Sequence, residues 1–185
     1  KIMTISQAKN ILAEATVSEE FSTMAGIYDL QEFLNVLGLV DKPSVSFGED
    51  NIYIGGNAGR AIVKYYYADP EILTTPTKPI TMPEEDVWFT LDETTVNGIK
   101  KAAAIFGHSQ MLVEADSGAI KLSVVDPDNS TANQYSITVD GGYNSESFKF
   151  IINIANLKMV QGTYNVKISK KLISQFTSED SNITY

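Results

Sequence analysis

Residues 148–169, FKFIINIANLKMVQGTYNVKIS, change from a strand pattern to a short helix pattern and then back to a strand pattern. Apolar residues first recur at every second position, which predicts a strand with a buried face. Asn153 stands where a helix N-cap belongs, and Gly162 can take the positive φ that ends a helix of about two turns. The expected buried positions are Phe148, Phe150 and Ile152 in the first strand, Ile154, Leu157 and Val160 in the helix, and Tyr164, Val166 and Ile168 in the second strand.

A second stretch, residues 27–47, repeats this order of features with the sequence IYDLQEFLNVLGLVDKPSVSF. Asp29 takes the place of Asn153 as the expected cap, and Pro43 takes the place of Gly162 as the breaker. Two copies of a strand, helix and strand unit favour two similar domains in tandem, although any capped amphipathic helix beside strands gives the same pattern. The expected core face of the earlier helix consists of Leu30, Phe33, Leu34 and Leu37.

The rest of the sequence indicates many short strands and one longer helix. That helix is predicted over residues 93–106, with Asp92 as its cap, Gly107 as its end, and Val96, Ile99, Ala103 and Phe106 as its buried stripe. Residues 140–144 are predicted to form a turn. Strands or strand pairs are expected at 1–17, 21–27, 45–47, 52–54, 61–67, 86–91, 111–115, 119–125, 134–139, 173–176 and from 183 onward.

Residues 69–83 form a proline-rich segment, with four of the chain's six prolines at Pro70, Pro76, Pro79 and Pro83. Prolines with threonines between them favour extended polyproline geometry and resist both helix and sheet, so we interpret this segment as a semi-rigid connector. The expected organisation is therefore a first domain at 1–73, a connector at 74–83 and a second domain at 84–185.

Composition limits the function classes. The chain has 185 residues, no cysteine and a net charge of −9. Disulfides and thiolate metal sites are therefore excluded, and no apolar run approaches the roughly 20 residues that span a bilayer, so we expect a soluble protein with no membrane partner. The net charge argues against a general nucleic-acid binder, although a total says nothing about where the charges lie.

Catalytic motifs are missing from the sequence. His108 is the only histidine and is interpreted as a solvated turn residue rather than a catalytic base. Asp92 and Glu93 are explained by a cap and a favourable first-turn charge. Because no phosphate loop, serine elbow or metal-spaced cluster is present, we expect a protein without enzyme activity, metal or cofactor.

Four segments carry a resemblance to a known family: residues 148–169, residues 25–40 (AGIYDLQEFLNVLGLV), the ADP of residues 68–70 and the TKPITMP of residues 77–83. They resemble the T-even-type bacteriophage sliding clamp, the processivity factor of the viral DNA polymerase, along almost the whole chain. The resemblance implies an α+β DNA clamp fold, in which two similar domains carry helices on one face of antiparallel sheets. Family members have a helix and strand before the position of Lys1 and a strand beyond Tyr185, so terminal elements are expected to be missing at both ends.

The same resemblance implies a function and its partners. The chain is expected to form a homotrimeric ring that encircles duplex DNA without sequence specificity, in the host cell cytoplasm. The ring would tether the DNA polymerase, and an ATP-dependent clamp loader would open it. The rival interpretations are a β-rich structural phage protein, such as a tail or capsid component, and a small-ligand binding module. Helices on one side of the sheets in both domains would favour the clamp.

The resemblance also assigns site residues. Lys100 and Lys101, on the outward face of the 93–106 helix, and Lys158 are expected to face DNA, although exposed lysines are ordinary on solvated helices. Ala104 stands where the family can carry a further basic residue. Ile80 and Met82 are expected to bind partner tails, with ordinary core packing as the alternative. The expected subunit interface pairs residues 61–67 with residues 134–139 of a neighbour, through Ala61, Val63, Tyr65, Tyr135 and Ile137.

Overall fold

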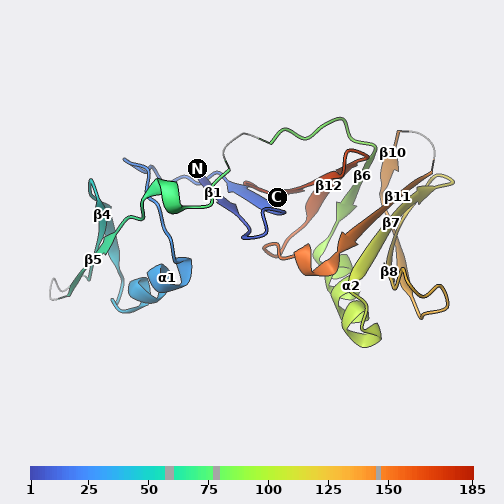
Figure 1. Ribbon diagram of the computed structural model, residues 1–185, viewed down its shortest axis with the longest axis horizontal. Helices are drawn as coiled ribbons and strands as arrows, with labels where there is room; N and C mark the ends of the chain where they lie inside the picture. The colour runs from blue at the N-terminus through green and yellow to red at the C-terminus, as the bar shows by residue number, and fades with distance from the viewer. Residues whose placement is uncertain (57–60, 77–79, 145–146) are drawn as a thin grey trace. The chain divides into compact units, whose positions relative to one another are not determined.

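The structure is a computed structural model that describes residues 1–56, 61–76, 80–144 and 147–185 (Figure 1). The chain divides into a larger unit, Lys1–Thr16 with Pro76–Tyr185, and a smaller unit, Val17–Thr75. This division differs from the expected one at the N-terminus, because β2 (Leu12–Ala15) pairs with β14 (Ile183–Thr184) near the other end of the chain.

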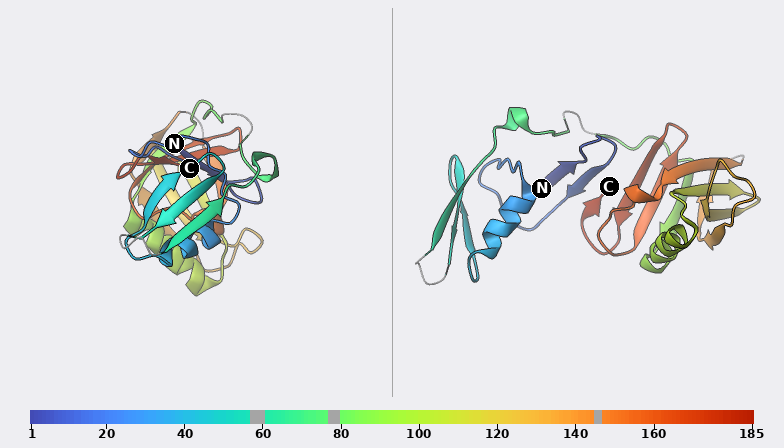
Figure 2. Two further views of the ribbon diagram at one scale, coloured as in Figure 1. Left: turned by 90° about the vertical axis from the view of Figure 1, so that its left-hand side faces the viewer. Right: turned by 60° about the horizontal axis from the view of Figure 1, so that its bottom comes forward.

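The larger unit contains, in its described residues, a seven-stranded sheet of order β1-β2-β14-β13-β12-β6-β10 and a four-stranded sheet of order β11-β7-β8-β9. All of the strand pairs within these two sheets are antiparallel. The strands of the larger unit can also be followed in the right-hand view of Figure 2. The remaining strands are β1 (Ile2–Ile5), β6 (Val87–Leu91), β7 (Gln110–Asp116), β8 (Ala119–Val125), β9 (Tyr135–Val139), β10 (Gly141–Tyr143), β11 (Phe148–Asn153), β12 (Tyr164–Ser169) and β13 (Ile173–Ser178).

One hydrophobic core joins both sheets of the larger unit with helix α2 (Glu93–Phe106). The two-residue period of the strands places alternate side chains in this core. On β6 these are Val87, Phe89 and Leu91, and on β7 they are Met111, Val113 and Ala115. The predicted strands and the predicted α+β class are therefore confirmed for this unit.

Helix α2 begins and ends where its local signals predict. Asp92 accepts a hydrogen bond from the Thr95 backbone N–H at 2.6 Å, and Gly107 closes the helix at a φ of 71°. Val96, Ile99 and Ala103 are buried, whereas Lys100 and Lys101 are exposed. The helical period in the sequence thus gave both faces of α2 correctly.

The smaller unit has a three-stranded antiparallel sheet, a helix α1 (Leu30–Gly38) and a 3₁₀ turn η1 (Pro70–Ile72). The sheet has the order β3-β4-β5, with β3 at Ser44–Phe47, β4 at Asn51–Gly55 and β5 at Ile62–Tyr66. Its core consists of Val40, Ile52 and Ile54, against which Phe33, Val36 and Leu37 of α1 pack. The predicted core face of α1 was wrong for Leu30 and Leu34, which are 62% and 51% exposed.

Two local predictions are corrected where tertiary contacts decide the backbone. Asn153 caps as predicted, by accepting from the Ala155 N–H, but only the 3₁₀ turn η2 (Ile154–Asn156) follows and Val160 is 56% exposed. The predicted two-turn helix is therefore wrong. Residues 140–144 are not a simple turn, because β10 pairs with β6 there. A Cβ on Gly141 would lie 2.1 Å from the Trp88 carbonyl oxygen, so glycine permits a close approach of two strands.

Two other segments also differ from the prediction. Residues 21–27 form no strand; Gly26 accepts a single backbone hydrogen bond from Ala68, at 2.9 Å, and Phe21 packs edge-on against Phe47. At the start of the proline-rich segment, Asp69 caps η1 by accepting from the Glu71 N–H at 2.9 Å. Proline fits the first position of such a turn, because its missing N–H would have no partner there.

Tyr164 gives the larger unit a predicted alkaline sensitivity. Its hydroxyl donates to the Val160 carbonyl at 2.6 Å, and burial, with Tyr185 beside it, raises its pKa from 10.0 to about 12. The folded state favours the neutral phenol. The contribution of Tyr164 to the free energy of unfolding is therefore complete below pH 10 and is lost as the pH rises through about 12. It amounts to roughly 2–3 kcal/mol.

We therefore expect Tyr164→Phe to lower the free energy of unfolding by about 1 kcal/mol at pH 7, where it loses one hydrogen bond. Between pH 10 and 12 the variant should lose less stability than the parent chain, because it has no phenol to ionise at this position. Urea unfolding at a series of pH values measures both effects. Parallel stability curves over that pH range would rule out this role for Tyr164.

Candidate nucleic-acid interface

The solvent face of α2 carries an uncompensated pair of cations. Lys100 and Lys101 are both exposed, and none of the ion pairs found in the described residues includes either of them. The ion-paired lysines are Lys1, Lys121, Lys149, Lys167 and Lys170. Because α2 has an acidic residue only in its first turn, at Glu93, the middle of its outward face is positive in a chain of net charge −9.

Lys158 lies beyond η2 rather than on a helix, and its side chain is exposed between buried Leu157 and half-buried Met159. The segment that carries it adjoins α2. A small cavity of about 30 Å³ is lined by Val96, Asn97 and Lys100 of α2 together with Leu157, Met159, Val160 and Tyr164. The structure thus brings Lys100 and the Lys158 segment onto adjoining elements, and their predicted contact with DNA stays a prediction.

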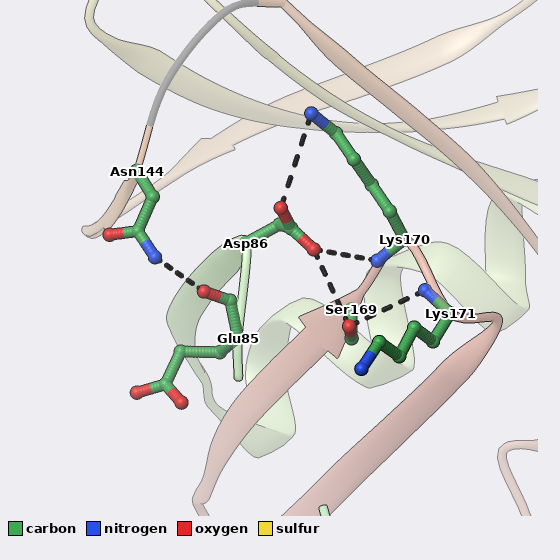
Figure 3. A network of polar contacts seen from close by, with 6 residues as sticks. All are labelled: Glu85, Asp86, Asn144, Ser169, Lys170 and Lys171. Carbon is green, nitrogen blue, oxygen red and sulfur yellow. Dashed lines mark hydrogen bonds and ion pairs between the residues drawn. The ribbon is translucent and has the colours of Figure 1, made fainter. Parts of the chain in front are cut away.

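The predicted partner residues follow the undescribed residues 77–79 of the connector. Ile80 is 58% exposed and Met82 is half-buried. Asp86, which follows Met82 closely in the sequence, fixes the chain to the seven-stranded sheet, as Figure 3 shows. The Asp86 carboxylate accepts from the Lys170 N–H at 2.7 Å and from the Ser169 hydroxyl at 3.4 Å, while its N–H donates to the Ile168 carbonyl at 2.8 Å.

Glu85 extends this anchor in two directions. Its carbonyl accepts from the Asn144 side-chain amide at 2.5 Å, and its carboxylate lies 3.0 Å from the Lys167 ammonium. The hydrogen bond from Lys167 holds the pKa of Glu85 below its ordinary value. Sequence reasoning missed this network, because Glu85 and Lys167 are far apart in the chain and neither stands in a recognisable motif.

Strand β5 lies at the edge of its sheet in the described residues. The predicted interface side chains of this segment differ in their exposure to solvent. Ala61 is exposed, but Val63 and Tyr65 are half-buried and pack against the core of their own unit. The Gly56 N–H donates to the Ala61 carbonyl at 3.4 Å, and the Tyr67 N–H donates to the Asp50 carbonyl at 3.1 Å. The main-chain N–H and C=O groups of the odd-numbered residues of β5 therefore point toward β4. By alternation, the main-chain groups of Ile62, Lys64 and Tyr66 point to the free edge.

Strand β9 is the matching edge of the four-stranded sheet, where β8 is its neighbour. Tyr135 and Ile137 are half-buried and pack against the core of the larger unit. Val63, Tyr65, Tyr135 and Ile137 therefore lie on two edge strands and pack against the cores of their own units, whereas Ala61 lies just before β5 and is exposed.

His108 sits directly after α2, and its Nε2 lies 2.8 Å from the Asn133 carbonyl. This contact ties the end of α2 to the segment before β9. In the part of the chain that the structure describes, no group of three His, Asp or Glu residues could hold a metal ion. None of the described helices is long and apolar enough to span a membrane.

The sequence is similar to bacteriophage proteins over nearly all of its length. A family described as gp45 sliding clamp, C terminal, matches residues 84–184. The sliding clamp of Vibrio phage KVP40 is 30% identical over 181 residues, which is 95% of this chain and 81% of that protein. The sliding clamp of Enterobacteria phage T4 is 30% identical over 190 residues, which is 98% of this chain and 82% of that protein.

Solved structures show the same fold at much lower sequence identity. The C. crescentus beta sliding clamp has a TM-score of 0.65 at 14% identity and covers 94% of this chain. The H. pylori beta clamp has a TM-score of 0.61 at 16% identity and covers 83%. This chain spans 49% and 42% of those two bacterial chains. With an antiparallel α+β fold, a basic helix face and close relatives of one kind, the chain belongs to the gp45 sliding clamp family of bacteriophages.

Proposed function

We propose that the chain acts as one protomer of a ring that encircles duplex DNA and tethers the replicative polymerase during processive synthesis. The observation that carries this proposal is the uncompensated pair Lys100 and Lys101 on the solvent face of α2, in a sliding clamp fold whose net charge is −9. Two adjacent cations on the outward face of one helix are what a ring with a positive inner wall and a negative exterior would need from each protomer.

The proposed binding chemistry is electrostatic and independent of sequence. Duplex DNA presents one phosphate charge about every 1.7 Å along its axis, so a few lysines per protomer can hold it without reading a base. Such contacts exchange readily, which permits sliding. Processivity then comes from the tether, because a polymerase bound to a ring that cannot leave the DNA stays at high effective concentration near the primer end.

Ring closure is proposed to pair the free edge of β5 with the free edge of β9 in a neighbouring protomer, which yields a homotrimer. Ala61, Val63 and Tyr65 would contribute from one side of this joint, and Tyr135 and Ile137 from the other. The structure adds that Ile62, Lys64 and Tyr66 supply the outward main-chain groups of β5. The edge-strand positions of β5 and β9 support this arrangement.

Partner proteins complete the proposed cycle in the host cell cytoplasm. Exposed Ile80 and half-buried Met82 are proposed to bind a tail of the polymerase, beside the point where Asp86 anchors the chain to the sheet. This rigid anchor would keep the apolar pair in a fixed position, which lowers the entropy cost of binding. An ATP-dependent clamp loader is proposed to open the ring, while the clamp itself carries out no chemistry.

Topological retention tests the proposed function directly. Once the loader has acted, we expect the protein to remain on nicked circular DNA in high salt, since salt weakens phosphate contacts but cannot open a closed ring. On linear DNA of equal length it should slide off the ends. Gel filtration of the labelled protein with each DNA measures this difference. Equal loss from circular and linear DNA would mean that the chain does not encircle its template.

A further inference from the structure

A groove of about 530 Å³ lies over β6, β12 and the start of β10 in the larger unit, on the face of the seven-stranded sheet that is opposite the core. Strand alternation places it there, because Phe89 and Val166 point into the core while their neighbours point outward. The groove is lined by Glu85, Trp88, Thr90, Asp140, Asn165 and Lys167, together with Thr177 and Asn144.

The strand register arranges these side chains in two rows. Thr90 is opposite Asn165, Asn165 is opposite Thr177, and the Thr90 N–H donates to the Asp140 carbonyl at 3.0 Å. Asp140, Thr90, Asn165 and Thr177 therefore form a polar row across the sheet. In the neighbouring row, Trp88 lies between Gly142 and Lys167.

The indole of Trp88 is an open platform. A Cβ on Gly142 would lie 2.6 Å from Cζ2 of the indole, so the ring rests directly on the glycine backbone. The side chain is nevertheless 39% exposed, next to hydrogen-bonding groups of the polar row. Exposed indoles bordered by polar groups are typical of binding surfaces rather than of a solvated sheet.

Two of the charged side chains in the groove form an ion pair with each other, and the third has no ion-pair partner among the described residues. The Lys167 ammonium is paired with Glu85 at 3.0 Å, whereas Asp140 is exposed and forms no ion pair with any described residue. The groove thus offers a free carboxylate and an aromatic face, and its one cation is already engaged. This combination is complementary to a cationic side chain.

We propose that this groove binds an extended peptide segment through an arginine whose guanidinium stacks on Trp88 and pairs with Asp140. Arginine fits better than lysine because its planar group can stack and bond to a carboxylate at the same time. The amide of Asn165 and the hydroxyls of Thr90 and Thr177 would bond to the peptide main chain. The net charge of −9 favours the approach of a basic partner segment. None of the residues that line this groove belongs to α2, whose lysines are proposed to face DNA.

Trp88 is the only tryptophan, so its fluorescence reports binding in the groove. The probes are blocked pentapeptides of sequence Ala-Ser-X-Ser-Ala, in which X is Arg, Gln or Glu. We expect the Arg peptide to change the emission saturably and to bind roughly 5–10-fold more tightly than the Gln peptide, from one cation–π contact and one exposed ion pair. The Glu peptide should bind most weakly, and added salt should reduce the preference for Arg.

A matched pair of variants separates the site from the general charge of the protein. Asp140→Asn should remove most of the Arg preference, whereas Asp128→Asn makes the same charge change before the start of β9 and should preserve it. Trp88→Leu, measured by calorimetry after circular dichroism has shown an unchanged fold, should also lose the preference. Absence of a saturable response to the Arg peptide, equal binding of all three peptides, tighter binding of the Glu peptide or an unaffected Asp140→Asn variant would each overturn the proposal. Neither DNA nor polymerase enters this experiment, so its result is independent of the proposed clamp activity.

Discussion

Replacing Lys100 and Lys101 together with glutamate is expected to abolish the stimulation of polymerase on long templates. Each protomer would change from two cations to two anions on the outward face of α2, and a ring would repeat that change in every protomer. Attraction to the phosphate backbone would become repulsion, so we expect loading and stimulation to fall by at least ~10-fold at moderate salt. Folding should be unaffected, because both side chains are exposed and glutamate favours helix about as strongly as lysine.

Primer extension on a long circular single strand measures this effect, and extension on a short template shows whether the polymerase itself is intact. The control is Lys9→Glu with Lys42→Glu, the same charge change at two exposed lysines outside α2. Neither of them is part of an ion pair in the described residues. If the α2 variant stimulated synthesis as well as the control, these lysines would have no role in holding DNA.

The sequence predicted α2 well because every signal for it is local. The cap at Asp92, the glycine at 107 and the apolar spacing between them all lie within one segment. The same signals failed after Asn153, where two tyrosine side chains form hydrogen bonds with the backbone of Val160. The Tyr185 hydroxyl accepts from the Val160 N–H at 3.2 Å, and Tyr164 donates to the Val160 carbonyl. These bonds replace the main-chain bonds that a second helical turn would need, and Tyr185 lies 25 residues from Val160, outside any short sequence window.

The candidate sites also differ in whether local sequence signals or contacts between distant residues form them. Exposure of Lys100 and Lys101 follows from helical spacing alone, so the sequence was sufficient to find them. The groove on the seven-stranded sheet was missed, because Trp88, Asp140 and Asn165 meet only through the pairing of β6 with β10 and β12. Two adjacent glycines at 141 and 142 indicated a turn, whereas their function is to let β10 approach β6 and to seat the indole.

Changing Lys64 to proline in β5 is expected to break the proposed ring into monomers. The odd-numbered residues of β5 bond to β4, so proline at position 64 removes an N–H from the free edge and leaves the sheet of the smaller unit paired. Each subunit joint would lose a main-chain hydrogen bond, and the proline ring would obstruct the approach of the neighbouring strand. The loss of roughly 1–3 kcal/mol per joint corresponds to about a 10-fold or greater rise in the protein concentration that assembly requires.

The matched control is Lys64→Thr, which keeps the N–H but loses the ammonium that lies 4.7 Å from the Tyr66 ring centroid and 5.8 Å from that of Tyr53. Light scattering over a range of concentrations should show trimers for the parent chain and for Lys64→Thr, and monomers for Lys64→Pro with an unchanged circular dichroism spectrum. Because a ring opens when any joint fails, the proline variant should also lose retention on circular DNA. A proline variant that remained trimeric would place the subunit joint on another edge, and monomers for both variants would assign the effect to the side chain instead of the strand edge.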